Sequence, residues 1–255
     1  MTQLEKVDLA NKGGETEPPA PGPATKRQSG RSWRWPVFIT AGLLAVVALV
    51  VVGYALAVRP WYMTIGSTAQ EQSMTLPGDE LIANPASKLN MAITIKAPAE
   101  EVWPWLVQIG NYRGGWYSYD AVENALGSAD FIDGHSLNRI APELQNLKVG
   151  DRIDITWKDA PLGLQVVQLE PNRALVMRWA NNGKVDGPTW VYALQKIDGQ
   201  TTRLITRALS ADSPDLPTLI MEPGEFVMYH KTMVGIKERA ERAWQGKLAA
   251  GAVAR

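Results

Sequence analysis

The stretch APAEEVWPWLVQIGNYRGGWYSYDAVEN, residues 97–124, decides the fold because it joins an amphipathic helix, a glycine break and an aromatic cluster. Pro98 suits the first helical position, where a missing N–H costs little. An interior Pro104 removes one helical hydrogen bond, so we expect a kink or a short first turn there. The apolar residues recur at the spacing of one helix face: Val102, Trp105, Leu106 and Ile109.

Three glycines, Gly110, Gly114 and Gly115, end this helix and allow backbone conformations that are closed to other residues. Aromatic rings follow at once, and a second short helix is predicted from Tyr119 to Leu126. Rings with polar tips on a glycine-hinged corner are typical of a cavity mouth, although a corner that simply packs is the alternative.

Alternating apolar residues predict six strands around this stretch. The first, Leu89–Ile95, leads directly into the helix at Pro98. Asp198-Gly199 is a strong hairpin signal. The five later strands are predicted at Asp151–Trp157, Gly163–Glu170, Ala174–Ala180, Pro188–Ile197 and Thr201–Ser210.

After a loop at Asp212–Pro223, a final helix is predicted over Gly224–Gln245. Strands joined by tight turns form an antiparallel meander, and the long helix after them makes the fold class α+β. The apolar stripe of the helix consists of Phe226, Tyr229, Met233, Ile236, Ala240 and Ala243.

Three motifs, LPGDE (Leu76–Glu80), RGGWYSYD (Arg113–Asp120) and PELQNLKVGD (Pro142–Asp151), resemble the membrane-anchored bacterial branch of the START-like superfamily, which includes polyketide cyclases and lipid-transfer domains. The resemblance covers roughly Leu76–Arg242. It implies a helix-grip fold: a curved antiparallel sheet around a long C-terminal helix, with an apolar cavity between them. The motifs are specific for this branch, but the branch is not tied to one reaction.

Residues Val37–Val58 carry no charge and are long enough, as a helix, to cross a hydrocarbon core of about 30 Å. Lys26, Arg27, Arg31 and Arg34 precede the run, so the positive-inside bias predicts a cytoplasmic N-terminus and an extracytoplasmic domain. The alternative is a signal peptide cleaved after Ala57, although the run is longer than the apolar region of about 7 to 15 residues that signal peptides usually contain.

The predicted organisation has five parts. They are a disordered cytoplasmic tail (1–36), a transmembrane helix (37–58), a connector (59–88), a START-like helix-grip domain (89–246) and a flexible tail (247–255).

Composition excludes several classes of function. The formal net charge is zero, so no nucleic-acid partner is implied. The absence of cysteine and the presence of only two histidines argue against Cys- or His-based metal sites and Cys nucleophiles. No phosphate-binding loop, dinucleotide fingerprint or HExxH motif occurs, and we therefore expect no cofactor.

Acid–base chemistry has three weak candidates. Asp120 and Glu123 lie three residues apart on the predicted short helix and share a face. His135, in a loop, is the only histidine nearby. Paired surface carboxylates are usually solvated, so catalysis is the lesser expectation.

A binding surface is the stronger expectation. Aromatic residues on alternating strand positions, together with the 97–124 stretch, are predicted to line the space between the sheet and the final helix. A filled aromatic core is the alternative. The strand residues Arg178, Arg203 and Arg207 are expected to face water, and the alternative is that they pair with a carboxylate of the ligand. The candidate ligand-binding residues are Trp116, Tyr117, Tyr119, Asp120, Asn124, Trp157, Trp179, Trp190 and Tyr192.

The sequence thus favours a membrane-anchored protein that binds an apolar small molecule or lipid, with the lipid bilayer as its other partner. The alternatives are a cyclase, dehydratase or hydrolase of the same superfamily, or an interaction module with a solid core.

Overall fold

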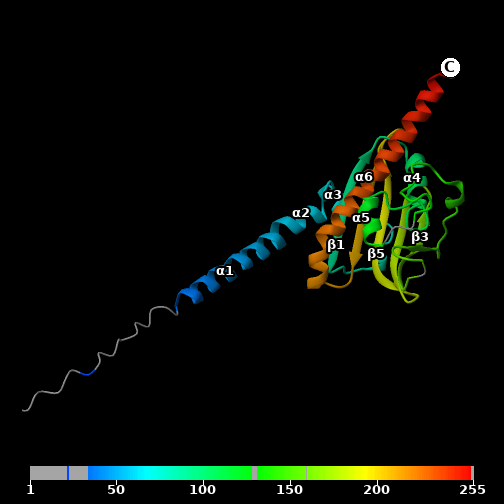
Figure 1. Ribbon diagram of the computed structural model, residues 1–255. Coiled ribbons are helices and arrows are strands. Elements are labelled where there is room, and N and C mark those ends of the chain that lie inside the picture. The colour runs from blue at the N-terminus through cyan, green and yellow to red at the C-terminus, as the bar shows by residue number, and fades with distance from the viewer. Residues whose placement is uncertain (1–21, 23–33, 128–130, 159, 254–255) are drawn as a thin grey trace, which may run out of the picture. The chain divides into compact units, whose positions relative to one another are not determined.

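A computed structural model of the chain describes residue 22 and residues 34–127, 131–158 and 160–253 (Figure 1). Most of the tail predicted for residues 1–36 lies outside these residues, as do Lys26, Arg27 and Arg31. The helix that was predicted to begin at Val37 begins three residues earlier, at Arg34.

The chain divides into two compact units, Met1–Val51 and Val52–Arg255. The first unit is helical from Arg34 onward, and its side chains from Trp35 onward are exposed. The helix α1 (Arg34–Gly53) continues as a π-helical turn, η1 (Tyr54–Val58), and as α2 (Arg59–Met63). Together they give one helix, Trp35–Met63, of 29 residues that is long and apolar enough to cross a membrane.

The second unit contains a six-stranded, fully antiparallel sheet in the order β1-β6-β5-β4-β3-β2. All six predicted strands are present, and the α+β class is confirmed. Strand β2 is shorter than predicted because it ends at Asp154, and β5 begins earlier. The strands are β1 (Ser87–Ile95), β2 (Arg152–Asp154), β3 (Leu162–Glu170), β4 (Ala174–Asn181), β5 (Lys184–Lys196) and β6 (Thr202–Ser210).

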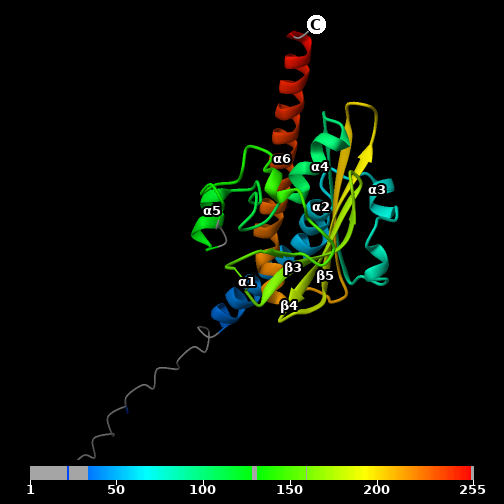
Figure 2. The same cartoon turned by 90° about the vertical axis from the view of Figure 1, so that its right-hand side faces the viewer.

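One face of the sheet is covered by α4 (Ala99–Val107) and by the long helix α6 (Leu216–Val253), as Figure 2 shows. The predicted apolar face of α4 and the centre of the predicted α6 stripe are buried. The main core lies between these helices and the sheet and includes Val102, Leu106, Met91, Leu175, Met177, Met233, Ile236 and Ala240. The arrangement is that of a helix-grip fold.

Helix α6 is longer at both ends than the sequence predicted. Asp215 caps its first turn, because its Oδ1 accepts hydrogen bonds from the Thr218 backbone N–H and hydroxyl at 2.9 and 2.6 Å. The expected loop therefore becomes helical from Leu216, with Pro223 inside the helix. At the other end the helix continues through residues 247–253, where a flexible tail was predicted. Lys247 pairs there with Glu101 of α4 at 2.8 Å.

The opposite face of the sheet is covered by the segment between α2 and β1, which was predicted to be only a connector. It contains α3 (Ala69–Ser73) and a 3-10 turn, η2 (Asp79–Leu81). Thr68 and Glu71 form a capping box at the start of α3. A second apolar cluster lies beneath this segment and consists of Leu76, Ala92, Val176, Val191, Ala193 and Ile205.

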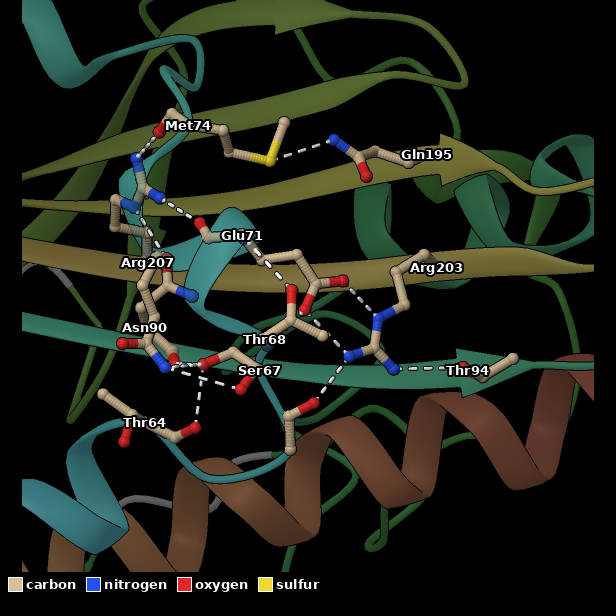
Figure 3. Close-up of polar contacts among 12 residues, drawn as sticks. Thr64, Ser67, Thr68, Glu71, Met74, Asn90, Thr94, Gln195, Arg203 and Arg207 are labelled. Carbon is tan, nitrogen blue, oxygen red and sulfur yellow. Dashed lines mark hydrogen bonds and ion pairs between the residues drawn. The ribbon is translucent and has the colours of Figure 1, made fainter.

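Two strand arginines hold this segment to the sheet (Figure 3). Arg207 is fully buried and pairs with Asp79, and it also donates to the backbone oxygens of Glu71 and Met74 at 2.7 and 2.9 Å. Arg203 forms an ion pair with Glu71 at 2.6 Å. The prediction that these arginines face water is therefore wrong, because carboxylates and carbonyls from a segment distant in sequence replace the water.

The 97–124 stretch makes a very close contact with α6, between Tyr117 and Gly235. Gly235 of α6 packs against the backbone of Tyr117, and a Cβ built on Gly235 would lie 2.1 Å from the Tyr117 carbonyl oxygen. Only glycine allows the helix to come this near. The φ of Gly235 is ordinary for a helix, so space rather than backbone conformation requires the glycine.

We predict that Gly235→Ala lowers the free energy of unfolding by about 1 to 3 kcal/mol, since the added methyl group must push α6 away from Tyr117. Gly246→Ala in the same helix is the matched control, because no atom lies within 4 Å of its added Cβ. That substitution should stabilise the protein by about 0.5 to 1 kcal/mol. Denaturant unfolding of the detergent-solubilised full chain measures both, and equal effects would contradict the prediction.

Candidate functional site

The RGGWYSYD loop is held by the end of α4. Arg113 donates to the carbonyl oxygens of Val107 and Ile109, at 2.6 and 3.2 Å, and so satisfies acceptors that the end of a helix leaves open. Gly110 and Gly115 exchange two backbone hydrogen bonds at 3.0 and 3.1 Å. This small bridge turns the chain sharply and fixes the position of the aromatic residues that follow.

Tyr117 is part of the solid core. Its ring makes an edge contact with Trp105, and the guanidinium of Arg239 lies 4.7 Å from the ring centroid. Its backbone N–H donates to the hydroxyl of Ser136 at 3.0 Å. The prediction that Tyr117 contributes to the cavity lining is therefore wrong, because α4, α6 and the loop at Ser136 together bury the residue.

Three tryptophans from different elements meet at one cavity. Trp116 is fixed by a 2.9 Å hydrogen bond from its indole N–H to Asn111, and Trp190 by a 3.0 Å bond to Thr206. Trp179 lies where the pairing of β4 with β5 shifts register, between Arg178 and Ala180. Such bulges redirect side chains, and here the tryptophan reaches the cavity.

The cavity has a volume of about 260 Å³ and lies between the sheet, α6 and α5 (Asp120–Ala125). A second cavity of about 190 Å³ shares four lining residues with it: Trp179, Trp190, Glu225 and Tyr229. The remaining residues that line the first cavity are Trp116, Ser118, Glu123, Leu126, Ile155, Met228 and Thr232. Its walls are thus mostly apolar and aromatic, with a few polar groups.

The two carboxylates of α5 have different environments. Both oxygens of Asp120 are occupied by Ser136, one by its hydroxyl at 2.6 Å and one by its backbone N–H at 3.0 Å. Asp120 therefore holds the loop. Glu123 lines the cavity, is only 3% exposed, and neither of its oxygens has a hydrogen-bond partner. Burial, reinforced by the nearby Asp120 carboxylate and only partly offset by the Ser118 hydroxyl, raises the pKa of Glu123 to about 7.

Other predicted site residues lie away from this cavity. Tyr119, Asn124 and His135 are exposed, and none of them lines it. Trp157 is 62% exposed, because β2 ends before it and the predicted alternation no longer applies. Tyr192 is buried next to Trp190, with ring centroids 5.9 Å apart, but it lies behind the cavity wall.

The sequence reasoning missed the contribution of α6 to the site. Glu225, Met228 and Thr232 line the cavity beside the apolar stripe, and Tyr229 was assigned to the stripe alone. Their spacing of three and four residues places them on one helix face, which is a signal that the sequence does contain. What it lacks is any sign that α6 stands away from the sheet there.

The sheet order and the position of α6 define the class of this domain as an α+β helix-grip protein. No protein-family model matches the chain, and no curated protein matches it. Among solved structures it is similar to protein MLL2253 from Mesorhizobium loti, with 16% identity, a TM-score of 0.38 and coverage of 61% of this chain and 98% of that one.

The chain is also similar to the Aha1 dimer from Colwellia psychrerythraea, with 16% identity, a TM-score of 0.38 and coverage of 61% and 96%. A third similar structure is PFC0360w, an HSP90 activator from Plasmodium falciparum, with 11% identity, a TM-score of 0.34 and coverage of 58% and 96%. At these TM-scores the likenesses assign no function to this chain.

We predict that stability falls as the pH rises from about 4.5 to about 7, because folded Glu123 holds its proton more tightly than it does in the unfolded chain. Above that window the ionised, unpaired carboxylate lowers the free energy of unfolding by up to about 3 kcal/mol. Glu123→Gln should remove this cost, so the variant should exceed the wild type in stability near pH 8 and match it near pH 4.

Unfolding of the detergent-solubilised full chain across this pH range measures the difference. Glu143→Gln is the matched control, since Glu143 is an exposed carboxylate whose substitution should leave the pH profile unchanged. A stability difference between Glu123→Gln and wild type that does not change with pH would contradict the prediction.

Proposed function

We propose that this chain is a single-pass membrane protein whose extracytoplasmic helix-grip domain binds an apolar small molecule or lipid beside the bilayer. The observation that carries the proposal is the aromatic-lined cavity between the sheet and α6. Ligand pockets are typically concave and mostly apolar, with a few polar groups that orient the ligand. The cavity that Trp116, Trp179, Trp190 and Tyr229 line has this character.

The position of the second cavity supports a ligand that comes from the membrane. Met63, the last residue of the apolar helix, lines that cavity together with Glu222 and Phe226 of α6. Arg59 binds Glu222 with two hydrogen bonds of 2.8 Å, and the Tyr62 hydroxyl donates to the same carboxylate at 2.7 Å. The end of the apolar helix and the cavity are thus built from adjoining residues.

The same contacts support retention of the apolar helix over cleavage. Tyr54 lies before the candidate cleavage site at Ala57, and its hydroxyl is 2.7 Å from that of the buried Tyr62. The backbone is helical across the site. Cleavage would therefore remove a residue that packs on the domain. Charge bias supports a cytoplasmic N-terminus, since Lys26, Arg27, Arg31 and Arg34 all precede the helix.

We predict that the full chain, expressed in bacterial cells, stays in the membrane pellet after alkaline extraction. Replacing both Val47 and Val50 by Asp should release it, since each charge at the centre of the helix costs about 3 kcal/mol of insertion. Replacing the same two residues by Leu is the control and should change nothing.

The orientation of the chain has a separate test. External protease should digest the domain in spheroplasts. A soluble wild-type protein with its N-terminus at Val58 would contradict membrane anchoring.

Ligand binding is tested by photolabelling the detergent-solubilised full chain with a neutral eight-carbon alcohol that carries a diazirine. Labels are expected on the cavity residues Met228 and Trp179, in addition to background labelling of the apolar helix. Met228→Trp should fill the cavity and abolish the labels there. Val227→Trp is the matched control, because Val227 is its exposed neighbour on α6. Labels confined to residues 35–58 would contradict a ligand-binding role.

A further inference from the structure

Glu123 is the unusual residue of the cavity. A buried polar group without a partner costs free energy, and an ionised one costs more, so such groups are rare in folded proteins. Both Glu123 oxygens are buried and unbonded, whereas Asp120, one turn earlier on α5, is fully bonded to Ser136. The fold therefore places a carboxylate that lacks a donor in the wall of the cavity, and a ligand can supply that donor.

A second carboxylate faces the same space. Glu225, on α6, lines the cavity opposite α5, and no lysine, arginine or histidine is among the described residues that line it. The ionisable groups of the lining are thus all acidic, and they would repel an anionic ligand such as a fatty acid. A guest with a positive charge would be attracted and would also relieve the cost of keeping Glu123 ionised.

The aromatic residues add to this preference. The indole N–H groups of Trp116 and Trp190 are already bonded to Asn111 and Thr206, so these rings offer faces rather than donors. The negative face of an aromatic ring attracts a cation, by about 0.5 to 2 kcal/mol when the cation is within about 6 Å. The ring of Tyr229 packs edge-on against Trp190, with centroids 4.2 Å apart, and extends this wall.

We propose, resting on the ligand-binding function above, that the cavity takes an amphipathic amine, with its apolar body against the tryptophans and its protonated nitrogen beside Glu123 and Glu225. This assigns two roles within one site. The rings provide affinity for apolar carbon, and the carboxylates select the charge of the ligand.

The test is a competition against the diazirine alcohol on the full chain in detergent, at about pH 8, where Glu123 is ionised and an alkylamine is protonated. The competitors are octylamine, octanol and octanoate, which share one chain and differ only in their polar end. Octylamine should displace the probe at about a tenfold lower concentration than octanol, and octanoate should be the weakest.

Glu123→Gln should bring octylamine to within about twofold of octanol, since it removes the charge without changing the shape of the side chain. Glu143→Gln, at a residue that does not line the cavity, should keep the full preference. If Glu123→Gln weakens all three competitors equally, Glu123 is only structural and the inference is overturned.

Two further outcomes separate this inference from the function on which it rests. Equal displacement by all three compounds on the wild type would overturn the amine assignment and leave the apolar-ligand function standing. Displacement by none of them, together with no labelling of the cavity, would overturn both.

Discussion

The close contact between Gly235 and the backbone of Tyr117 is the constraint on which the rest of the structure depends. It anchors the middle of α6 to the RGGWYSYD loop, and the neighbouring Met233 and Ile236 complete a densely packed core. Toward its N-terminal end the same helix presents Glu225 and Tyr229 to open space instead. Because α6 contacts the domain closely at its centre, a cavity remains between the N-terminal part of the helix and the sheet, and the tryptophans line this cavity.

The outer face of the sheet explains how the domain is joined to the apolar helix. The segment after α2 lies on that face, and the buried Arg207 binds its backbone carbonyls and Asp79. A buried ion pair of this kind is a weak source of net stability, but its loss leaves an uncompensated charge. It therefore specifies one position for the segment. The chain then passes from the outer face into β1, and the Arg59–Glu222 pair holds the end of α2 beside the cavity.

Asp120 and Glu123 show how tertiary surroundings separate two carboxylates that the sequence treats as equivalent. They share one short helix and the same predicted chemistry. Asp120 meets two donors from Ser136 and becomes a fixed structural link, whereas Glu123 meets none and remains against the cavity with a raised pKa. The difference comes from a loop sixteen residues away, so helical periodicity alone had no means of predicting it.

The sequence by itself determined the α+β class, all six strands, the apolar helix and the stripe of α6, because these follow from local periodicity, turn residues and length. It also identified Trp116, Trp179 and Trp190, which the fold brings together. Only the tertiary structure decided that Arg207 is buried, that Tyr117 is core rather than cavity wall, and that Trp157 is exposed. Each of these depends on which distant segment covers the residue, and burial of that kind is a property of the packed chain and not of its local pattern.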